Sequence, residues 1–237
     1  MKNKITQSLS IFFPAYNEEE NVTESALQAL KVASEITDDY EVIIVDDGST
    51  DKTAKIIDEL AKKYSHFRAI HHKINQGYGG AVWTGVTNCT KDLIFFTDVD
   101  LQFKIDELKK FIPYIKEYDA VIGYRAPRRD PFMRLVNAWG WKVMINFLFN
   151  LGVRDIDCAF KLFKKDIFQK VSVESRGAMI SAEMLIRIKK GGFKVKELPV
   201  GHYPRKAGSP TGAKPAVIAK AFKELLKVHK ELKKESK

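Results

Sequence analysis

Two aspartates one residue apart, Asp98 and Asp100, are the residues whose type and spacing first indicate chemistry. They follow an apolar run, residues 93–96, in the stretch LIFFTDVDLQF. If the chain is still extended there, alternate side chains point to the same side, so both carboxylates can face one cation. Carboxylate oxygens suit Mg²⁺ or Mn²⁺ better than Zn²⁺. Such pairs also occur in plain loops and helix caps, so the motif alone leaves both interpretations open.

The elements that must position these acids alternate along the first half of the chain. Helical patterns are predicted to begin at caps formed by Asn17, with Glu20 three residues later, and by Asp51. Apolar, β-branched or aromatic runs bounded by turn residues predict strands at 9–13, 40–47, 67–72, 93–98 and 119–124. This order predicts an α/β fold with a single doubly wound, mostly parallel sheet and helices on both faces. Ligands bind outside the carboxyl ends of the strands in such sheets.

The usual nucleotide-binding fingerprints are not present. The stretch QGYGGA contains Gly77, Gly79 and Gly80, but Val82 stands where the dinucleotide fingerprint needs glycine, and no P-loop pattern occurs. A dinucleotide dehydrogenase or a P-loop kinase is therefore not expected. The glycines permit close approach of the backbone to a ligand ahead of a helix, or they form a bare turn.

Length and cysteine content limit the class of protein. The 237 residues predict one domain, residues 1–212, followed by a C-terminal helix at 213–237. Cys89 and Cys158 lack metal-ligand spacing, so neither a structural zinc nor a disulfide framework is expected. The N-terminal residues do not resemble a signal peptide, and we expect a cytoplasmic protein.

A net charge of +10 calls for anionic partners or a solvated lysine-rich surface. Nucleic acid is not favoured, because the sequence shows neither zinc-finger spacing nor an aromatic RNA-binding strand. Diphosphates and an anionic membrane surface remain as candidates, since a membrane attracts basic segments by about 1 kcal/mol per Lys or Arg.

Two later segments combine apolar and basic residues. Residues 131–151 are rich in Phe, Trp, Leu and Met but are interrupted by Arg134, Lys142 and asparagines. A transmembrane helix needs about 20 predominantly apolar residues, so we reject spanning, while a core helix and a helix lying against lipid both stay open. Residues 214–237 place an apolar stripe opposite lysines, which fits packing on the domain or binding to an anionic bilayer.

Five motifs in a fixed order resemble one family. PAYNEEENV, VDDGSTD, NQGYGGA, TDVDLQ and GYR resemble the family 2 glycosyltransferases of GT-A fold. Within these, the chain is similar to the polyprenyl-phosphate sugar transferases, the group that contains dolichol-phosphate mannosyltransferase. The resemblance runs from about residue 9 to about residue 212, nearly the whole chain.

The resemblance implies a donor site at the strand ends. Asp98 and Asp100 would bind Mg²⁺ or Mn²⁺, and Gln102 would join them through the metal or its waters. The base and ribose of a GDP- or UDP-linked sugar would be contacted by Pro14, Ala15, Tyr16, Glu18 and Asp46. Gly77 of the glycine-rich turn would also belong to the substrate-binding residues.

The resemblance also implies a set of basic residues around the phosphates. Arg125 of GYR would contact the diphosphate or the acceptor phosphate, and Arg128 and Arg129 would belong to a basic acceptor loop. Arg205 and Ser209 would close over the diphosphate. Together with Asp100, the residues Arg125 and Arg205 form the expected catalytic set.

The implied reaction is an inverting sugar transfer to polyprenyl phosphate. A phosphate acceptor arrives largely ionised and needs no general base, so we assign that role neither to Asp157 nor to Glu183. A soluble glycan or protein hydroxyl acceptor is the alternative, with Asp157 as candidate base. A non-catalytic nucleic-acid-binding module is a remote one. The lipid tail of a polyprenyl phosphate acceptor lies in the bilayer, so the enzyme must reach the membrane surface. Relatives often carry C-terminal transmembrane helices, but we expect no spanning segment in this sequence. We therefore expect peripheral docking at the cytoplasmic membrane face, directly or through a small membrane anchor protein.

Overall fold

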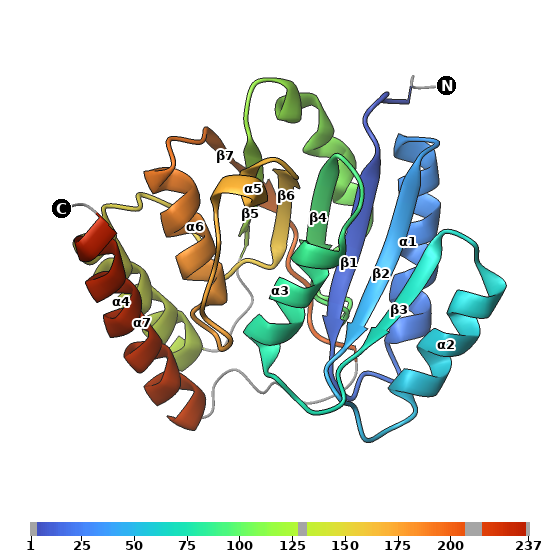
Figure 1. Ribbon diagram of the computed structural model, residues 1–237, viewed down its shortest axis with the longest axis horizontal. Helices are drawn as coiled ribbons and strands as arrows, with labels where there is room; N and C mark the ends of the chain where they lie inside the picture. The colour runs from blue at the N-terminus through green and yellow to red at the C-terminus, as the bar shows by residue number, and fades with distance from the viewer. Residues whose placement is uncertain (1–3, 128–131, 207–214, 236–237) are drawn as a thin grey trace.

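The chain folds around a seven-stranded sheet with the strand order β3-β2-β1-β4-β6-β5-β7 (Figure 1). The computed structural model describes residues 4–127, 132–206 and 215–235. The strands are β1 Leu9–Ala15, β2 Tyr40–Asp46, β3 Phe67–His71, β4 Leu93–Thr97, β5 Ala120–Arg125, β6 Phe160–Lys164 and β7 Val195–Val200. The five strands predicted in the first half of the chain are therefore confirmed.

Most neighbouring strands in the sheet are parallel. The pairs β1–β2, β1–β4, β2–β3 and β5–β7 are parallel, whereas β6 runs antiparallel to both β4 and β5. This confirms the predicted mostly parallel α/β sheet. The strands β6 and β7 were not predicted, because a lysine interrupts the apolar run FKLF of β6 and charged residues interrupt VKELPV of β7.

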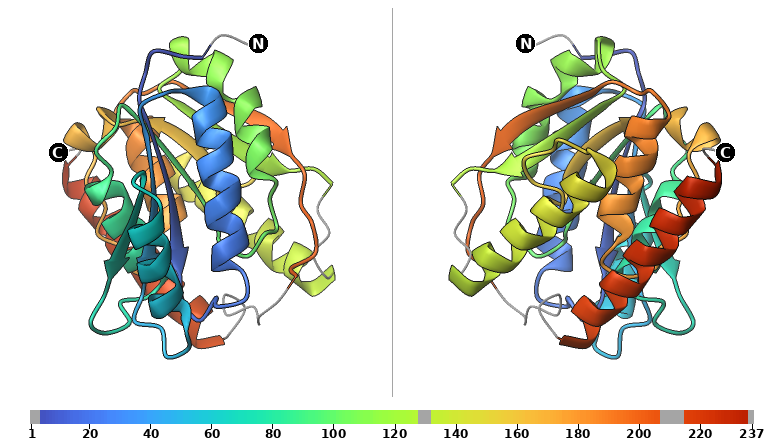
Figure 2. Two further views of the ribbon diagram at one scale, coloured as in Figure 1. Left: turned by 90° about the vertical axis from the view of Figure 1, so that its right-hand side faces the viewer. Right: turned by 90° about the vertical axis from the view of Figure 1, so that its left-hand side faces the viewer.

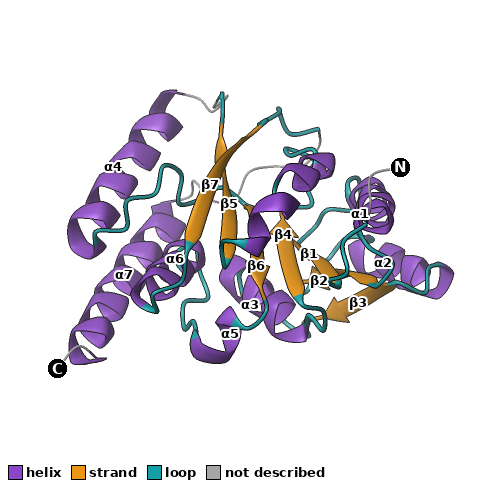
Figure 3. Ribbon diagram, turned by 90° about the horizontal axis from the view of Figure 1, so that it is seen from above, coloured by secondary structure: helices purple, strands orange, loops and turns teal. Residues whose placement is uncertain are grey.

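Helices cover both faces of the sheet (Figures 2 and 3). One face carries α1 Val22–Ile36, α2 Thr53–Lys63 and two 3₁₀ helices, η1 Ile105–Lys110 and η2 Ile112–Lys116. The other face carries α3 Tyr78–Asn88, α5 Ile167–Lys170 and α6 Ile180–Lys190. The strands β1, β2 and β4 are buried between these layers, since a parallel sheet covered on both faces needs apolar residues on both.

The helix start predicted at Asn17 is wrong. Helix α1 begins at Val22, and its N-cap residue is Asn21. Asn17 has a left-handed backbone, φ 55°, which asparagine tolerates better than most residues. Its Oδ1 accepts a hydrogen bond of 2.8 Å from the backbone N–H of Thr50. Asn17 therefore joins the loops that follow β1 and β2 instead of capping a helix.

Two long helices lie side by side at one end of the molecule, α4 Phe132–Phe149 and α7 Pro215–Glu235 (Figures 1 and 3). The Trp141 ring packs edge-on against Phe222, with 5.8 Å between the ring centroids. The inner side of α7 contributes Leu225, Val228 and Leu232 to the main hydrophobic core, so this helix packs on the domain. Within the described ranges, no helix is both long and apolar enough to cross a membrane.

Candidate active site

The aspartate pair lies at the carboxyl end of β4. Asp100 is 7% exposed. Burial and the charge of Asp100 raise the pKa of Asp98 to about 7. Two crowded carboxylates with this electrostatic penalty favour a bound cation, so the donor set fits Mg²⁺ or Mn²⁺. Among the described residues, no group of three or more His, Cys, Asp or Glu gathers as a metal site.

Arg205 links the acid pair to the loop after β1. Its Nη2 forms an ion pair with Glu18 Oε1 and lies 3.8 Å from Asp100 Oδ2. Glu18 also accepts a 2.6 Å hydrogen bond from Asn21 Nδ2. Burial raises the pKa of Glu18, although Asn21 and Arg205 oppose the shift. Three of the residues predicted for the site, Glu18, Asp100 and Arg205, thus meet at one place.

Gln102 is close to the acid pair through its backbone. Its N–H donates to Asp100 Oδ1 at 3.2 Å. Its side-chain nitrogen donates to the Tyr203 carbonyl at 3.2 Å and lies 3.3 Å from His202 Nε2. Gln102 therefore holds the segment that leads to Arg205 next to the end of β4. Its role as a metal-associated residue stays a prediction.

Asp46 is buried at the end of β2. Its Oδ1 accepts a 3.0 Å hydrogen bond from the backbone of Ser49, and its Oδ2 lies 3.2 Å from His71 Nδ1. On the other side of the ring, His71 Nε2 lies 3.1 Å from Asp58 Oδ1. Burial lowers the pKa of His71, but the two carboxylates outweigh this effect and raise it. This network fixes the side chain that we predicted to lie near the base.

Asp47, which the sequence analysis left unassigned, orders the glycine-rich turn. Its two carboxylate oxygens accept hydrogen bonds of 2.8 Å each from the backbone N–H groups of Gln76 and Gly77. Gly77 has φ 86°, a conformation that favours glycine. The predicted pocket residues at the end of β1 differ in exposure. Pro14 and Ala15, the last two residues of the strand, are buried, whereas Tyr16, which follows them, is 42% exposed.

Arg125 is held by a carboxylate to which sequence reasoning gave no role. The guanidinium makes a bidentate ion pair with Asp155, with hydrogen bonds of 2.7 and 2.8 Å. Both side chains are buried. Asp155 belongs to RDIDCAFKLF, which resembles a D-x-x-C-G-F-[KR] element of the family, but a role was weighed only for Asp157. The only signal in the sequence was that an aspartate follows, 30 residues later, the strand that ends at Arg125. No local pattern indicates that the two residues pair.

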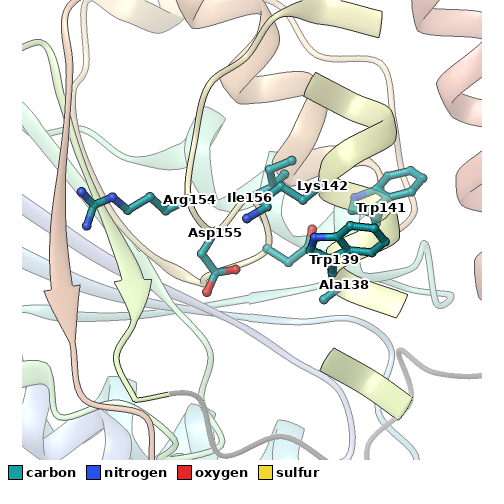
Figure 4. A pocket seen from close by; sticks show the side chains of 8 residues that line it. Ala138, Trp139, Trp141, Lys142, Arg154, Asp155 and Ile156 are labelled. Carbon is teal, nitrogen blue, oxygen red and sulfur yellow. The ribbon is translucent and has the colours of Figure 1, made fainter. Parts of the chain in front are cut away.

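A pocket of about 200 Å³ opens beside this ion pair (Figure 4). Asp155 and its chain neighbours form one side, and α4 forms the other. The pocket combines aromatic rings with charged groups of both signs. Its lining residues are Ala138, Trp139, Trp141, Lys142, Arg154, Asp155, Ile156 and Asp157.

Lys161 is a charged residue in the interior of the domain. Lys161 is fully buried in β6, where its ammonium donates to the Cys158 carbonyl and lies 5.4 Å from the centroid of the Phe96 ring. Burial lowers the pKa of Lys161, and the charges of Asp155, Asp157 and Asp98 oppose the shift. Sequence reasoning gave this lysine no role, because its strand was not recognised.

Glu183 organises a backbone segment in the interior. Its carboxylate accepts hydrogen bonds from the backbone of Glu174 at 3.1 Å and of Ser175 at 2.8 Å, and from Arg187 Nε at 2.7 Å. These contacts give Glu183 a structural task. This task agrees with the expectation that Glu183 is not a general base.

Comparison with known proteins identifies the family. The model of Glycosyl transferase family 2 matches residues 10–172. The chain belongs to this family. Its match includes the ends of β1, β2 and β4, where Glu18, Asp46 and Asp100 lie. The later segment with Arg205 lies beyond it.

Curated relatives of this family 2 chain include a dolichyl-phosphate glucosyltransferase. Glycosyltransferase AglD of Haloferax volcanii is 29% identical over 207 residues, 83% of this chain and 33% of that protein. Dolichyl-phosphate beta-glucosyltransferase ALG5A of Trichomonas vaginalis is 30% identical over 209 residues, 81% of this chain and 64% of that protein. The chain therefore spans between a third and two thirds of the length of these relatives.

Solved structures confirm the GT-A fold of this family 2 member. Mannosyl-3-phosphoglycerate synthase of Rubrobacter xylanophilus superimposes with a TM-score of 0.73 at 15% identity, covering 97% of this chain and 75% of that one. Glucosyl-3-phosphoglycerate synthase of Mycobacterium tuberculosis, in complex with Mn²⁺ and UDP-glucose, gives a TM-score of 0.69 at 18% identity, covering 94% of this chain and 79% of that one.

Three predicted site residues, Arg128, Arg129 and Ser209, lie outside the described residues.

Proposed function

We propose that this family 2 chain catalyses the metal-dependent, inverting transfer of a hexose from a GDP- or UDP-linked sugar to a polyprenyl phosphate. The meeting of Asp98, Asp100, Glu18 and Arg205 at the carboxyl edge of the sheet carries the proposal. The proposal is supported by the dolichyl-phosphate glucosyltransferase among the relatives. It is also supported by an undecaprenyl-phosphate 4-deoxy-4-formamido-L-arabinose transferase of Proteus mirabilis, 30% identical over 161 residues, 67% of this chain and 49% of that protein.

The donor side must stabilise the negative charge that develops on the leaving diphosphate. When bound by Asp98 and Asp100, Mg²⁺ or Mn²⁺ supplies Lewis-acid stabilisation of that charge. Arg205 adds a guanidinium next to Asp100, and such groups donate paired hydrogen bonds to phosphates. Glu18 holds Arg205 in this position before the donor binds.

The acceptor side must place a phosphate without a general base, since the second pKa of a phosphate monoester is about 6. Asp155 fixes the guanidinium of Arg125, the arginine that we propose to meet a phosphate. The neighbouring pocket offers Trp139 and Trp141 to an apolar chain and Lys142 to a phosphate. This arrangement suits an amphiphilic acceptor better than a polyhydroxyl glycan.

A sugar-transfer assay tests the proposal. The full chain is incubated with Mn²⁺ or Mg²⁺, a short polyprenyl phosphate and radiolabelled GDP- or UDP-sugars, and the organic phase is counted. We expect label in the organic phase with one donor, only in the presence of metal. Asp100→Asn should abolish the transfer, whereas Asp106→Asn, at an exposed aspartate of η1, should leave it unchanged. No lipid labelling with any donor would refute the lipid acceptor.

A soluble hydroxyl acceptor is the second candidate, because Asp157 lines the pocket beside the Arg125–Asp155 pair. Such an acceptor needs a base. Asp157→Asn would then abolish transfer to a water-soluble glycan. With a phosphate acceptor, the same variant should retain lipid labelling, so this variant distinguishes the two reactions.

We infer that the site works at the cytoplasmic face of a membrane. Helix α4 exposes Trp139, Val143 and Phe147 at a spacing of four residues, and α7 exposes Phe222 and Leu226. We call these five residues the apolar patch. Exposed lysines accompany it on α7, at 223, 230, 233 and 234. Apolar side chains with flanking lysines are typical of helices that lie on anionic bilayers, and a small membrane anchor protein is the alternative partner.

A further inference from the structure

The phenol of Tyr78 touches the proposed metal site from the side of the glycine-rich turn. Tyr78 is the first residue of α3, and its hydroxyl donates to Asp98 Oδ1 at 3.0 Å. The residue is 39% exposed, so it lies at the mouth of the site.

The position of Tyr78 is fixed from both sides along the chain. On one side, Asp47 binds the N–H of Gly77 at 2.8 Å. On the other, the N–H of Gly80 donates to the Arg176 carbonyl at 3.2 Å. A Cβ at Gly79 would lie 2.6 Å from the backbone of Arg176, so the two segments are in close contact. The backbone of Tyr78 cannot move without disturbing this contact.

A fixed donor on one carboxylate oxygen has a defined chemical effect. A phenol is protonated at neutral pH, so the Tyr78 hydroxyl donates to the ionised Asp98 carboxylate. The hydrogen bond stabilises the ionised carboxylate and restricts its rotation. The hydrogen bond uses Oδ1 of Asp98, so we expect Oδ2 to be the oxygen that faces a cation.

We infer that Tyr78 is a positioning residue for the metal-binding carboxylate of Asp98, through which it sets the affinity of the acid pair for a divalent cation. This inference rests on the proposed function. It assigns a task to a side chain of NQGYGGA in addition to the backbone approach of its glycines. Groups that hydrogen-bond a metal ligand typically change metal affinity by about 10- to 100-fold when they are removed.

Direct Mn²⁺ binding tests the inference without sugar transfer. The full chain and its Tyr78→Phe variant are titrated with Mn²⁺ alone, and free Mn²⁺ is measured by electron paramagnetic resonance. We expect Kd to rise about tenfold in the variant, with an unchanged melting temperature. Tyr114→Phe, at an exposed tyrosine of η2, is the matched control and should bind Mn²⁺ like the wild type.

The transfer assay supplies a second readout. In Tyr78→Phe, the Mn²⁺ concentration for half-maximal activity should rise about tenfold, while kcat at saturating Mn²⁺ stays within about twofold. If the variant binds Mn²⁺ as tightly as the wild type, the inference is wrong and the proposed function stands. If the wild type binds Mn²⁺ no better than Asp100→Asn does, both are wrong.

Discussion

The guanidinium of Arg125 donates two hydrogen bonds, of 2.7 and 2.8 Å, to the two carboxylate oxygens of Asp155. Both side chains are buried, so neither charge has water as a substitute partner. This pairing fixes the arginine that we propose to meet a phosphate. It also makes the arginine sensitive to the loss of its partner, because an unpaired buried charge is costly.

Removing the partner of Arg125 should therefore destabilise the protein. We expect Asp155→Ala to lower the free energy of unfolding by about 3–5 kcal/mol, measured by urea denaturation. Arg125→Lys keeps the charge but loses the bidentate geometry, so sugar transfer should fall about tenfold or more. Equal activity of Arg125→Lys and the wild type would show that the guanidinium shape is not used.

Glu183 should prove structural and not catalytic. Glu183→Ala leaves two backbone N–H groups and Arg187 without their buried acceptor, and we expect a loss of about 3–5 kcal/mol in unfolding free energy. Glu174→Gln removes a surface ion pair with Lys227 and should cost less than about 1 kcal/mol. At temperatures where Glu183→Gln is folded, kcat should stay within about threefold of the wild type. A loss of several orders of magnitude would instead indicate a general base.

Two glycine-to-alanine substitutions should change stability in opposite directions. At Gly79 in α3, a Cβ would lie 2.6 Å from backbone atoms of Arg176 and Gly177, and we expect a loss of about 1–3 kcal/mol. At Gly140 in α4, a Cβ meets nothing within 4 Å, and alanine should stabilise the helix by up to about 1 kcal/mol. Thermal denaturation of both variants checks the packing of α3 on residues 176–177. A stable Gly79→Ala would contradict that packing.

His71 should give a pH-dependent contribution to stability. Because hydrogen bonds from its ring to the carboxylates of Asp46 and Asp58 raise the pKa of His71 above 6.5 in the folded state, its stabilisation is fully present below the unfolded-state pKa. The stabilisation is lost as the pH rises through the higher folded-state pKa. The difference in unfolding free energy between the wild type and His71→Gln should accordingly shrink from pH 6 to pH 8.5. Asp58→Asn should reduce this pH dependence, and a difference that is constant with pH would argue against the ion pairs.

The apolar patch should contribute to membrane binding. Phe147 is 88% exposed, and burying a phenyl ring contributes about 1.5–3 kcal/mol. We expect Phe147→Ser to weaken partitioning onto phosphatidylglycerol-containing vesicles by about tenfold or more, measured by flotation. Leu27→Ser, at an exposed leucine of α1, should have no effect. Equal flotation of Phe147→Ser and the wild type would favour recruitment by a membrane anchor protein.

Local patterns of the sequence predicted the first five strands and the aspartate pair. A buried parallel strand requires an apolar run, as in β4. Asp98 is the first charged residue after this run and marks the end of the strand. Asn17 shows where local rules fail. Its spacing to Glu20 matches a capping box, but its side chain binds the backbone of Thr50 in the neighbouring loop.

The sequence by itself determined that acids, glycines and arginines follow successive strands of one α/β sheet, because periodicity and turn chemistry are local properties of the chain. Only the tertiary structure decided which of them meet. The ion pair of Arg205 with Glu18 joins residues 187 positions apart. The Arg125–Asp155 pair forms because the segment before β6 comes back beside β5, with which β6 pairs. Such contacts depend on how the strands are ordered in the sheet, which no local pattern specifies.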